Sequence, residues 1–476
     1  MKALASIILL SVLPCLASAE RELKSKETAT AAAPPNIIFI LADDLGYGDP
    51  GCYGGQTIAT PNIDRLAAEG LRFTQAYSGG PVCAPARAVL MTGMHNGRTP
   101  ARDNVPHYHT YLRDHHVTLA EVLKEAGYQT SGVGKWSLGD AGTEGRATAQ
   151  GFDTWFGYLN QDHAHYYYPE YLDDNNGRLE LKDNTTTRKH YSHDLLTERA
   201  LQFIHKSKDN PFFLYAAYAL PHFSARDEDP DGLTVPTTDP YSDRNWDERS
   251  KKYAAMVHML DRDVGRILDL LDELALTENT LVIFTSDNGG HKTIHERFDT
   301  NGPLRGYKRD LTEGGIRVPF IARWPKEIPA GETSDAVIAF QDMLPTFADL
   351  AGATTPSDLD GISVTNALRG QPLPERTTPL YWDYGHCRGK QYAQAARIGK
   401  WKAIRSLKTD NQIELYNLNT DLGESDDLAA AHPELVEKFA AFMDQAVVPD
   451  PRYEIGTTYK GSAIWKKEAA PTLAPK

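Results

Sequence analysis

The stretch IIFILADD, residues 37–44, joins a short apolar run rich in β-branched residues to two consecutive aspartates. An unbroken apolar run of this length is typical of a strand that is buried on both faces of a parallel sheet. In open α/β sheets, ligands bind at the carboxyl ends of such strands. The stretch therefore predicts a parallel sheet and places Asp43 and Asp44 at its ligand-binding edge.

Other short strand-like runs follow along the chain and alternate with amphipathic helical patterns. Thr60 followed by Pro61 indicates one helix start, Thr118 with Glu121 forms a capping box at another, and a long helix is predicted over about residues 250–275. This alternation predicts an α/β fold, a large mostly parallel sheet flanked by helices. The further strands are expected at YQTSGV (128–133), FFLYAAYA (212–219), LVIFTS (281–286) and VPFIAR (318–323).

The pattern changes near residue 375. Four short strand-like segments, PLYWDY, YAQAARIG, KWKAIRS and IELYNL, follow one another before a helix from Pro433 to about Ala446. They predict a smaller C-terminal α+β domain with a short antiparallel sheet. We therefore expect a catalytic domain at 36–374 and the small domain, with its terminal helix and tail, at 375–476.

The first residues carry a targeting pattern. Residues 1–19, MKALASIILLSVLPCLASA, contain a lysine, an apolar run and a closing Ala-Ser-Ala, as in a secretory signal peptide, and polar and Ala/Pro-rich residues 20–35 follow as a flexible leader. Lipidation of Cys15 is the weaker alternative, because Pro14 precedes it. No later segment is apolar for the roughly 20 residues that span a bilayer. We expect a secreted or periplasmic protein without a membrane span.

The net charge of −14 argues against a nucleic-acid partner and means that an anionic substrate needs a local cationic pocket. Export would permit disulfides. Cys52 and Cys387 could form a disulfide with each other or remain free thiols. Cys83 is left out of this pair, because it lies in a motif of its own.

Charged or titratable residues follow four of the predicted strands. Asp43-Asp44, Lys135, His222 after Pro221, and Asp287-Asn288 each come at or just after a strand end. Any one of these is more often an ordinary loop residue, but together they predict one site. Asp43, Asp44, Asp287 and Asn288 offer only oxygen ligands, which suit one hard cation, Ca²⁺ or Mg²⁺, rather than zinc.

Cys83 lies in GPVCAPARAVLMTG, residues 80–93. Pro85 suits the first position of a helix, and ARAVLMTG continues a helical pattern, so Cys83 is expected at a helix start where an anion is favoured. The alternative is a buried thiol, which is common for free cysteine.

The segment Cys83-Ala84-Pro85-Ala86-Arg87 resembles the C-x-P-x-R motif of the type I sulfatases, of the alkaline-phosphatase-like superfamily. Further segments resemble motifs of that family in the family's order, over about residues 36–325. They are Asp43-Asp44, Thr92-Gly93, Gly134-Lys135-Trp136, Ser286-Asp287-Asn288-Gly289, and Lys308 ahead of Glu313-Gly314-Gly315. The small C-terminal domain is also similar to that of the family.

The resemblance implies that a separate formylglycine-generating enzyme oxidises Cys83 to formylglycine before folding. One hydroxyl of the hydrated aldehyde would attack sulfur, and the other would later expel sulfate. Asp43, Asp44, Asp287 and Asn288 would hold Ca²⁺, with Mg²⁺ the second choice, and an oxygen of modified Cys83 would complete the shell.

The resemblance also assigns roles to the positive residues. Arg87 would hold the hydrate, Lys135 and Lys308 would neutralise charge on the sulfuryl oxygens, and His222 with Lys308 would protonate the leaving alcohol. The implied activity is that of a sulfatase.

One position departs from the family. The family commonly has GKWHLG, whereas this chain has serine at 137, and a serine is no base near neutral pH. Three explanations are open. Another histidine supplies the proton transfer, a water does so, or the protein turns over slowly or not at all. His95, His163, His165 and His291 are the candidate replacements, and the sequence does not rank them.

Aromatic residues in the segment 155–171, WFGYLNQDHAHYYYPEY, favour a sulfated carbohydrate as substrate, because aromatic faces suit sugar rings. A packed loop is an equally good interpretation of this segment. Ser137, His163, His165 and His291 are the candidate substrate residues.

Three other functions compete with the sulfatase. A phosphonate monoester or phosphodiester hydrolase of the same superfamily can share the motifs, and a noncatalytic protein that binds sulfated glycans would have lost turnover through Ser137. A sulfotransferase is disfavoured, because the chain lacks a phosphate-binding glycine-rich motif. The ring position of the sulfate, the sugar, exo or endo action and the oligomeric state have no readable signal.

Overall fold

The computed structural model describes residues 34–104, 111–224, 229 and 231–458. The predicted signal peptide with Cys15, most of the leader and the last residues of the chain lie outside the described residues, so those predictions stay predictions.

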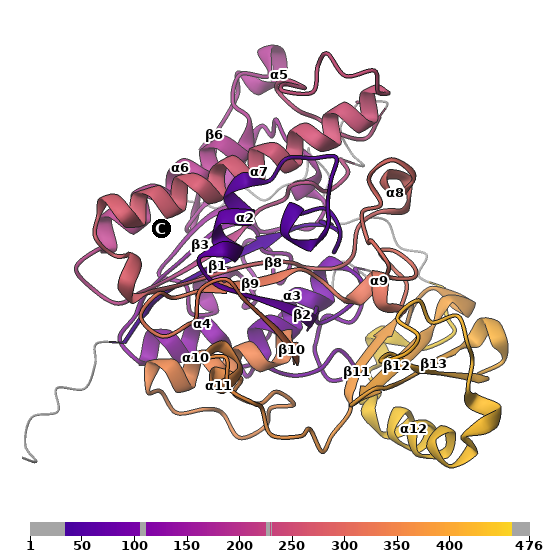
Figure 1. Cartoon of the computed structure of the whole chain (residues 1–476). Helices are drawn as coiled ribbons and strands as arrows, with labels where there is room; N and C mark the ends of the chain where they lie inside the picture. Colours follow the sequence, from indigo (N-terminus) through magenta and orange to yellow (C-terminus); the bar gives the residue numbers. More distant parts are fainter. Residues whose placement is uncertain (1–33, 105–110, 225–228, 230, 459–476) are drawn as a thin grey trace, which may run out of the picture. The chain divides into compact units, whose positions relative to one another are not determined.

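A ten-stranded sheet forms the centre of the described chain, in the order β10-β2-β9-β8-β1-β7-β3-β4-β5-β6 (Figure 1). β1 pairs in parallel with both β7 and β8, and β9 is antiparallel to both of its neighbours. The strands are β1 (Asn36–Ala42), β2 (Leu71–Tyr77), β3 (Gln129–Lys135), β4 (Thr154–Tyr158), β5 (Tyr171–Asp174), β6 (Gly177–Glu180), β7 (Phe212–Ala217), β8 (Thr280–Ser286), β9 (Phe320–Arg323) and β10 (Glu332–Ala339). The predicted large, mostly parallel sheet is confirmed.

Helices cover both faces of this sheet. Ile38 and Ile40 of β1 belong to one apolar cluster, and Ile37, Phe39 and Leu41 belong to another, as the two-residue period of a strand requires. The first cluster includes residues of α2 (Pro61–Ala68), α6 (Ser192–Ser207) and α7 (Glu248–Glu273), and the second includes residues of α3 (Cys83–Thr92), α4 (Leu119–Glu125) and α10 (Met343–Ala351). The shorter helices are α5 (Asn184–Thr187), α8 (Lys292–Phe298), α9 (Glu313–Ile316) and α11 (Thr365–Leu368).

The helix starts agree with the sequence in part. The capping box of α4 is present, because the Glu121 N–H donates to Thr118 Oγ1 and the Thr118 N–H donates to Glu121 Oε2. The predicted start of α2 is confirmed, with Thr60 at the N-cap and Pro61 as the first helical residue, but the Thr60 side chain makes no capping hydrogen bond. Its hydroxyl accepts from the Gly51 N–H instead, and the free N–H groups of the first turn of α2 donate to Asp261 of α7.

The helix that carries Cys83 begins at Cys83 itself, so Pro85 is its third residue and not its first. Proline fits the third position as well as the first, because none of the first residues of a helix has an intrahelical acceptor for its N–H. The expected position of Cys83 at a helix start is confirmed.

A four-stranded antiparallel sheet, β11-β12-β13-β14, follows the large sheet in sequence. One face contacts Tyr77, Val82, Leu311 and Ile316 of the large part, and the other packs against α12. The predicted boundary at 374/375 stays a prediction, because the sheet begins only at Leu380. The elements are β11 (Leu380–Tyr384), β12 (Ala393–Ile398), β13 (Trp401–Ser406), β14 (Ile413–Asn417) and α12 (Pro433–Ala446).

Cys52, Cys83 and Cys387 are all free thiols in the described part of the chain, so Cys52 and Cys387 do not form a disulfide here. Within the same residues, every helix is too short or too polar to cross a bilayer.

Candidate active site

Four neighbouring strands of the large sheet deliver the predicted site residues to one edge. β8, β1, β7 and β3 are consecutive in the sheet. Asp43-Asp44 follow β1, Asp287-Asn288 follow β8, His222 lies five residues beyond β7, and Lys135 is the last residue of β3. Backbone bonds continue past the strand ends, since the Asp43 N–H donates to Leu220 O and the Asp287 N–H to Ala42 O.

The oxygen-bearing residues form one buried cluster. The Asp44 N–H donates to Asp287 Oδ1 at 3.2 Å, and Asn288 Nδ2 donates to Asp44 Oδ1 at 2.7 Å. The side chains of Asp43, Asp44, Asp287 and Asn288 are all shielded from solvent. Asn288 Oδ1 has no hydrogen-bond partner among the described residues, so this buried acceptor is available to a ligand.

Close backbone packing holds the loop after β8 against the segment 313–315. The Gly289 N–H donates to Gly315 O, and a Cβ on Gly289 would lie 1.8 Å from Gly314 O. Only glycine fits at position 289, which gives the Asn288-Gly289 pair a structural reason.

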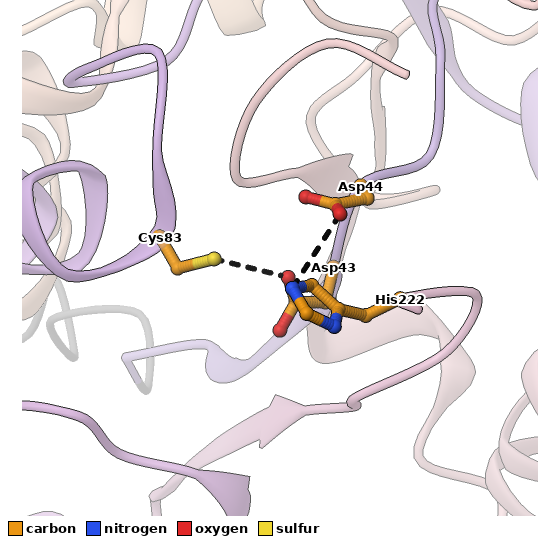
Figure 2. Close-up of side chains that lie close together, drawn as sticks. All are labelled: Asp43, Asp44, Cys83 and His222. Atoms are coloured by element: carbon orange, nitrogen blue, oxygen red, sulfur yellow. Dashed lines mark hydrogen bonds and ion pairs between the residues drawn. The ribbon is translucent and has the colours of Figure 1, made fainter. Parts of the chain in front are cut away.

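The Cys83 thiol points toward Asp43 of this cluster, as Figure 2 shows. Sγ is 3.3 Å from Asp43 Oδ1 and 3.8 Å from Lys308 Nζ. Ligand atoms of Asp43, Asp44, Cys83 and His222 all lie within 4.8 Å of one another, a group that could hold a metal ion. The Ala84 N–H at the start of α3 donates to Asn104 Oδ1 at 3.1 Å, a contact that no sequence pattern indicates.

Three buried cations surround the carboxylates. Arg87 Nη2 is 2.8 Å from Asp287 Oδ2 and 3.3 Å from Asp43 Oδ2, and Lys135 Nζ is 2.6 Å from Asp43 Oδ2. Lys308 Nζ is 2.7 Å from Asp44. Arg87, Lys135 and Lys308 therefore converge on the predicted cluster of acids.

Burial and mutual charge shift the pKa values of these groups. Burial alone would raise the pKa of Asp43, but Lys135 and the other positive groups hold it well below its usual range. Burial, assisted by the Asp43 carboxylate, raises the pKa of Asp287 to about 7. The same two causes raise the pKa of the Cys83 thiol to about 12. Burial is the largest single influence on each of these pKa values, and the opposite directions for Asp43 and Asp287 show that the nearby cations favour the charged form of Asp43 most strongly.

His222 is tied to Lys308. Its Nδ1 lies 2.6 Å from Phe223 O and must donate there, because a carbonyl only accepts. Nε2 is then free to accept from Lys308 Nζ at 3.0 Å. Burial and the Lys308 charge lower the pKa of His222 to about 3. The proton that this pair can deliver therefore resides on Lys308 in the free site.

Ser137 is buried after β3 with φ of +64°, and its hydroxyl has no partner among the described residues. The four candidate histidines lie in different places. The His95 ring contacts Tyr381 at a tilt of 57° and lies 3.8 Å from Asp360, and His163 packs between Tyr158 and Tyr171. The His165 ring contacts the His222 ring at a tilt of 38°, whereas His291 caps α8 and packs on Phe223.

The aromatic segment is mostly interior. Trp155, Phe156, Tyr158 and Tyr167 are each no more than 3% exposed. The first three belong to strand β4, so they pack in the interior as the alternative interpretation expected, but in a strand and not in a loop. Tyr166 and Tyr168 are half-buried. The segment is therefore not a continuous aromatic surface for a sugar.

Known proteins resemble this chain over most of its length. Residues 35–353 match the family model described as Sulfatase, and residues 306–446 match that described as N-sulphoglucosamine sulphohydrolase, C-terminal. N-acetylgalactosamine-6-sulfatase of Canis lupus familiaris is 35% identical over 404 residues, 79% of this chain and 72% of that protein. Arylsulfatase A of Homo sapiens is 34% identical over 467 residues, 85% of this chain and 86% of that protein.

Solved structures agree with the sequence comparisons. Ps i-CgsB, in a crystal structure with k-i-k-neocarrahexaose, has a TM-score of 0.78 at 30% identity and covers 89% of this chain and 95% of its own.

The sheet, the site at its edge and these matches define a hydrolase of the alkaline-phosphatase-like superfamily. The chain belongs to the sulfatase family and is a sulfuric ester hydrolase. The resemblance that the motifs indicated is confirmed.

Proposed function

We propose that this protein is an exported sulfatase that hydrolyses sulfate monoesters on sulfated saccharides, with a nucleophile derived from Cys83 and one bound Ca²⁺. The observation that carries the proposal is the meeting of Cys83, at the start of a helix, with the buried oxygen ligands and three cations. The residues 1–19 support export through their sequence pattern alone.

Relatives support a saccharide as the substrate. One relative is named for N-acetylgalactosamine 6-sulfate, and a neighbour in fold was crystallised with a neocarrahexaose. Both names contain sugars, although different ones. We therefore propose the substrate class and leave the sugar to experiment.

The acid cluster fits a hard cation. Asp43, Asp44, Asp287 and Asn288 supply oxygen atoms only, and Asn288 Oδ1 is a buried acceptor without a partner among the described residues. Burial, assisted by the neighbouring Asp43 carboxylate, raises the pKa of Asp287 to about 7, and a bound cation would favour its charged form. When bound, Ca²⁺ would polarise the S–O bonds of the ester and neutralise developing charge.

Cys83 fits the modification that the family uses. As formylglycine hydrate, it would offer one hydroxyl to form a bond to sulfur with loss of the alcohol, and a second to release sulfate and restore the aldehyde. Arg87 is fully buried and paired with Asp43 and Asp287, and it would hold the hydrate in place. We also propose a formylglycine-generating enzyme as the partner that acts before folding.

The chain's own residues would bind the sulfate and move the proton. Lys135 and Lys308 are positioned to neutralise the sulfuryl oxygens. Lys308 holds the proton that His222 Nε2 accepts, so the pair can pass it to the leaving alcohol oxygen.

The test is sulfate release from sulfated sugars. Protein coexpressed with a formylglycine-generating enzyme, with conversion of Cys83 checked by peptide mass, is assayed on N-acetylgalactosamine 6-sulfate and on carrageenan oligosaccharides. We expect release from at least one of them and a loss on the order of 10⁴-fold or more in Cys83→Ala. Near wild-type activity in Cys83→Ala would overturn the assignment of the nucleophile.

A further inference from the structure

Position 137, where the family commonly has a histidine, holds a serine in this chain, so the site lacks one imidazole. The four candidate histidines lie in different surroundings. His95 lies beside Asp360 and Tyr381 of the small-sheet side, and His163 is enclosed by two tyrosines. His291 uses its Nδ1 to cap α8. Of the four, only His165 has its ring against His222, with ring centroids 4.7 Å apart.

The His165 imidazole is ready for a ligand. Both ring nitrogens are shielded from solvent, and neither has a hydrogen-bond partner in the described part of the chain. A buried polar group without a partner costs about 1–3 kcal/mol, so such groups are rare unless something else binds them. Both nitrogens of His165 are therefore available to a group that also reaches His222.

The backbone around His165 fixes where the ring lies. The His165 N–H donates to Asp162 O, and its carbonyl accepts from Ser224 Oγ at 2.5 Å. Ser224 follows His222 by two residues, so this bond joins the two histidine-bearing segments. The positive charges of Lys135 and Lys308 and the negative charge of Asp43 all act on the ring, which places it beside the catalytic cluster.

The chemistry of the ring suits a sulfate ester. A neutral imidazole presents one N–H donor and one acceptor nitrogen, whereas an ester oxygen accepts and a sugar hydroxyl can do both. His222 is the residue proposed to protonate the leaving group, and the His165 ring contacts the His222 ring. A donor at His165 would therefore meet the substrate on its leaving-group side.

We propose that His165 binds the substrate directly, through a hydrogen bond to an oxygen on the leaving-group side of the sulfate ester, next to His222. This inference rests on the proposed function. It assigns a substrate-binding role to the second histidine of the His163-Ala164-His165 sequence and none to the first.

The test measures binding without turnover. In the Cys83→Ala protein, saturated with Ca²⁺, calorimetry gives the Kd of 4-nitrophenyl sulfate. His165→Leu keeps much of the side-chain bulk but has no donor, and we expect it to weaken binding by about 10- to 100-fold. His165→Gln keeps an N–H donor, and we expect it to recover most of the affinity. The surface variant His205→Ala is the matched control and should bind like its parent.

The outcomes separate the two proposals. If the Cys83→Ala parent binds the ester and both His165 variants bind it equally well, the role of His165 is wrong while the sulfatase proposal stands. If the parent binds no sulfate ester, the site proposed for the reaction fails, and the role of His165 fails with it. The thermal unfolding of each variant is measured as well, and an unchanged Tm shows that a loss of affinity does not come from unfolding.

Discussion

Cys83 illustrates why a plain thiol would serve poorly at this position. With a pKa of about 12, raised by burial and by Asp43, the unmodified side chain stays protonated at neutral pH. The thiolate is the reactive form of cysteine. The same carboxylate surroundings that suppress a thiolate are the ones that can hold a cation.

Most of the candidate site could be predicted from the sequence, because its residues lie in short motifs at strand ends. Asp43, Asp287 and Cys83 were identified this way, and the structure brings them together. Two features could not be predicted. They are the contact of Asn104 with the Ala84 N–H and which of the four candidate histidines lies against His222. Both depend on contacts across loops, and sequence distance carries no information about such contacts.

Removal of His222 should matter most for poor leaving groups. In His222→Ala, we expect kcat/KM to fall by about 10²–10⁴-fold on a sugar sulfate, since a sugar alcohol needs a proton to leave. An activated aryl sulfate, whose phenol leaves without protonation, should lose much less. The comparison of the two substrates on converted enzyme is the measurement, and equal losses would argue against a general acid at His222.

Asp49 makes a pH-dependent contribution to stability. Its Oδ2 accepts from the Gly46 N–H, Tyr253 and Thr300, and burial raises its pKa from 3.8 to about 7. A raised folded-state pKa stabilises the fold fully below the unfolded value, and this contribution is lost as pH rises through about 7.

We therefore expect the stability of wild type relative to Asp49→Asn to decrease between pH 4 and pH 8, since asparagine does not titrate there. Urea unfolding at several pH values measures this difference, with the exposed Asp209→Asn as control. A difference that is constant with pH would contradict the raised pKa.

At the level of elements, strands with a long, unbroken apolar run were easier to predict than short or interrupted ones. The run at 37–42 is apolar throughout, and its strand is fully buried. β2, β4, β5, β6 and β10 were not predicted. Arg72, Thr74 and Gln75 interrupt the apolar pattern of β2, β4 and β5 are short, and β6 and β10 are partly exposed. The direction of β9, antiparallel within a mostly parallel sheet, depends on chain connections that the local pattern does not encode.

A buried ion cluster joins the small sheet to the segment after Lys308. Lys402 of β13 lies 2.9 Å from Glu313 and 2.8 Å from Glu424, with all three side chains fully buried. The Glu313 N–H also donates to Glu424 Oε2. This cluster holds the start of α9, close in sequence to Lys308.

Lys402→Met should leave two buried carboxylates with too little positive charge. We expect a loss of about 3–5 kcal/mol in the free energy of unfolding, as for other buried pairs that lose one partner. Denaturant unfolding is the measurement, and Lys408→Met, at an exposed position, should change it by less than about 0.5 kcal/mol. Equal effects of the two variants would mean that the cluster does not hold the two parts together.

For the whole molecule, the bound cation is expected to contribute to stability as well as to activity. A ligand that binds only the folded state stabilises it by about 2.7 kcal/mol at a concentration 100 times its Kd. Chelation should therefore lower Tm and abolish sulfate release, and Ca²⁺ should restore both. Asn288→Ala should reduce the response of Tm to Ca²⁺, and an unchanged response would exclude Asn288 as a ligand.

The most direct test of the account compares two esters on the converted enzyme. An aryl sulfate and an aryl phosphonate monoester with the same leaving group are hydrolysed by protein whose Cys83 conversion is verified by peptide mass, with Cys83→Ala beside it. We predict a clear preference for the sulfate ester, and no turnover of either ester by Cys83→Ala. A preference for the phosphonate, or activity that survives in Cys83→Ala, would contradict the account.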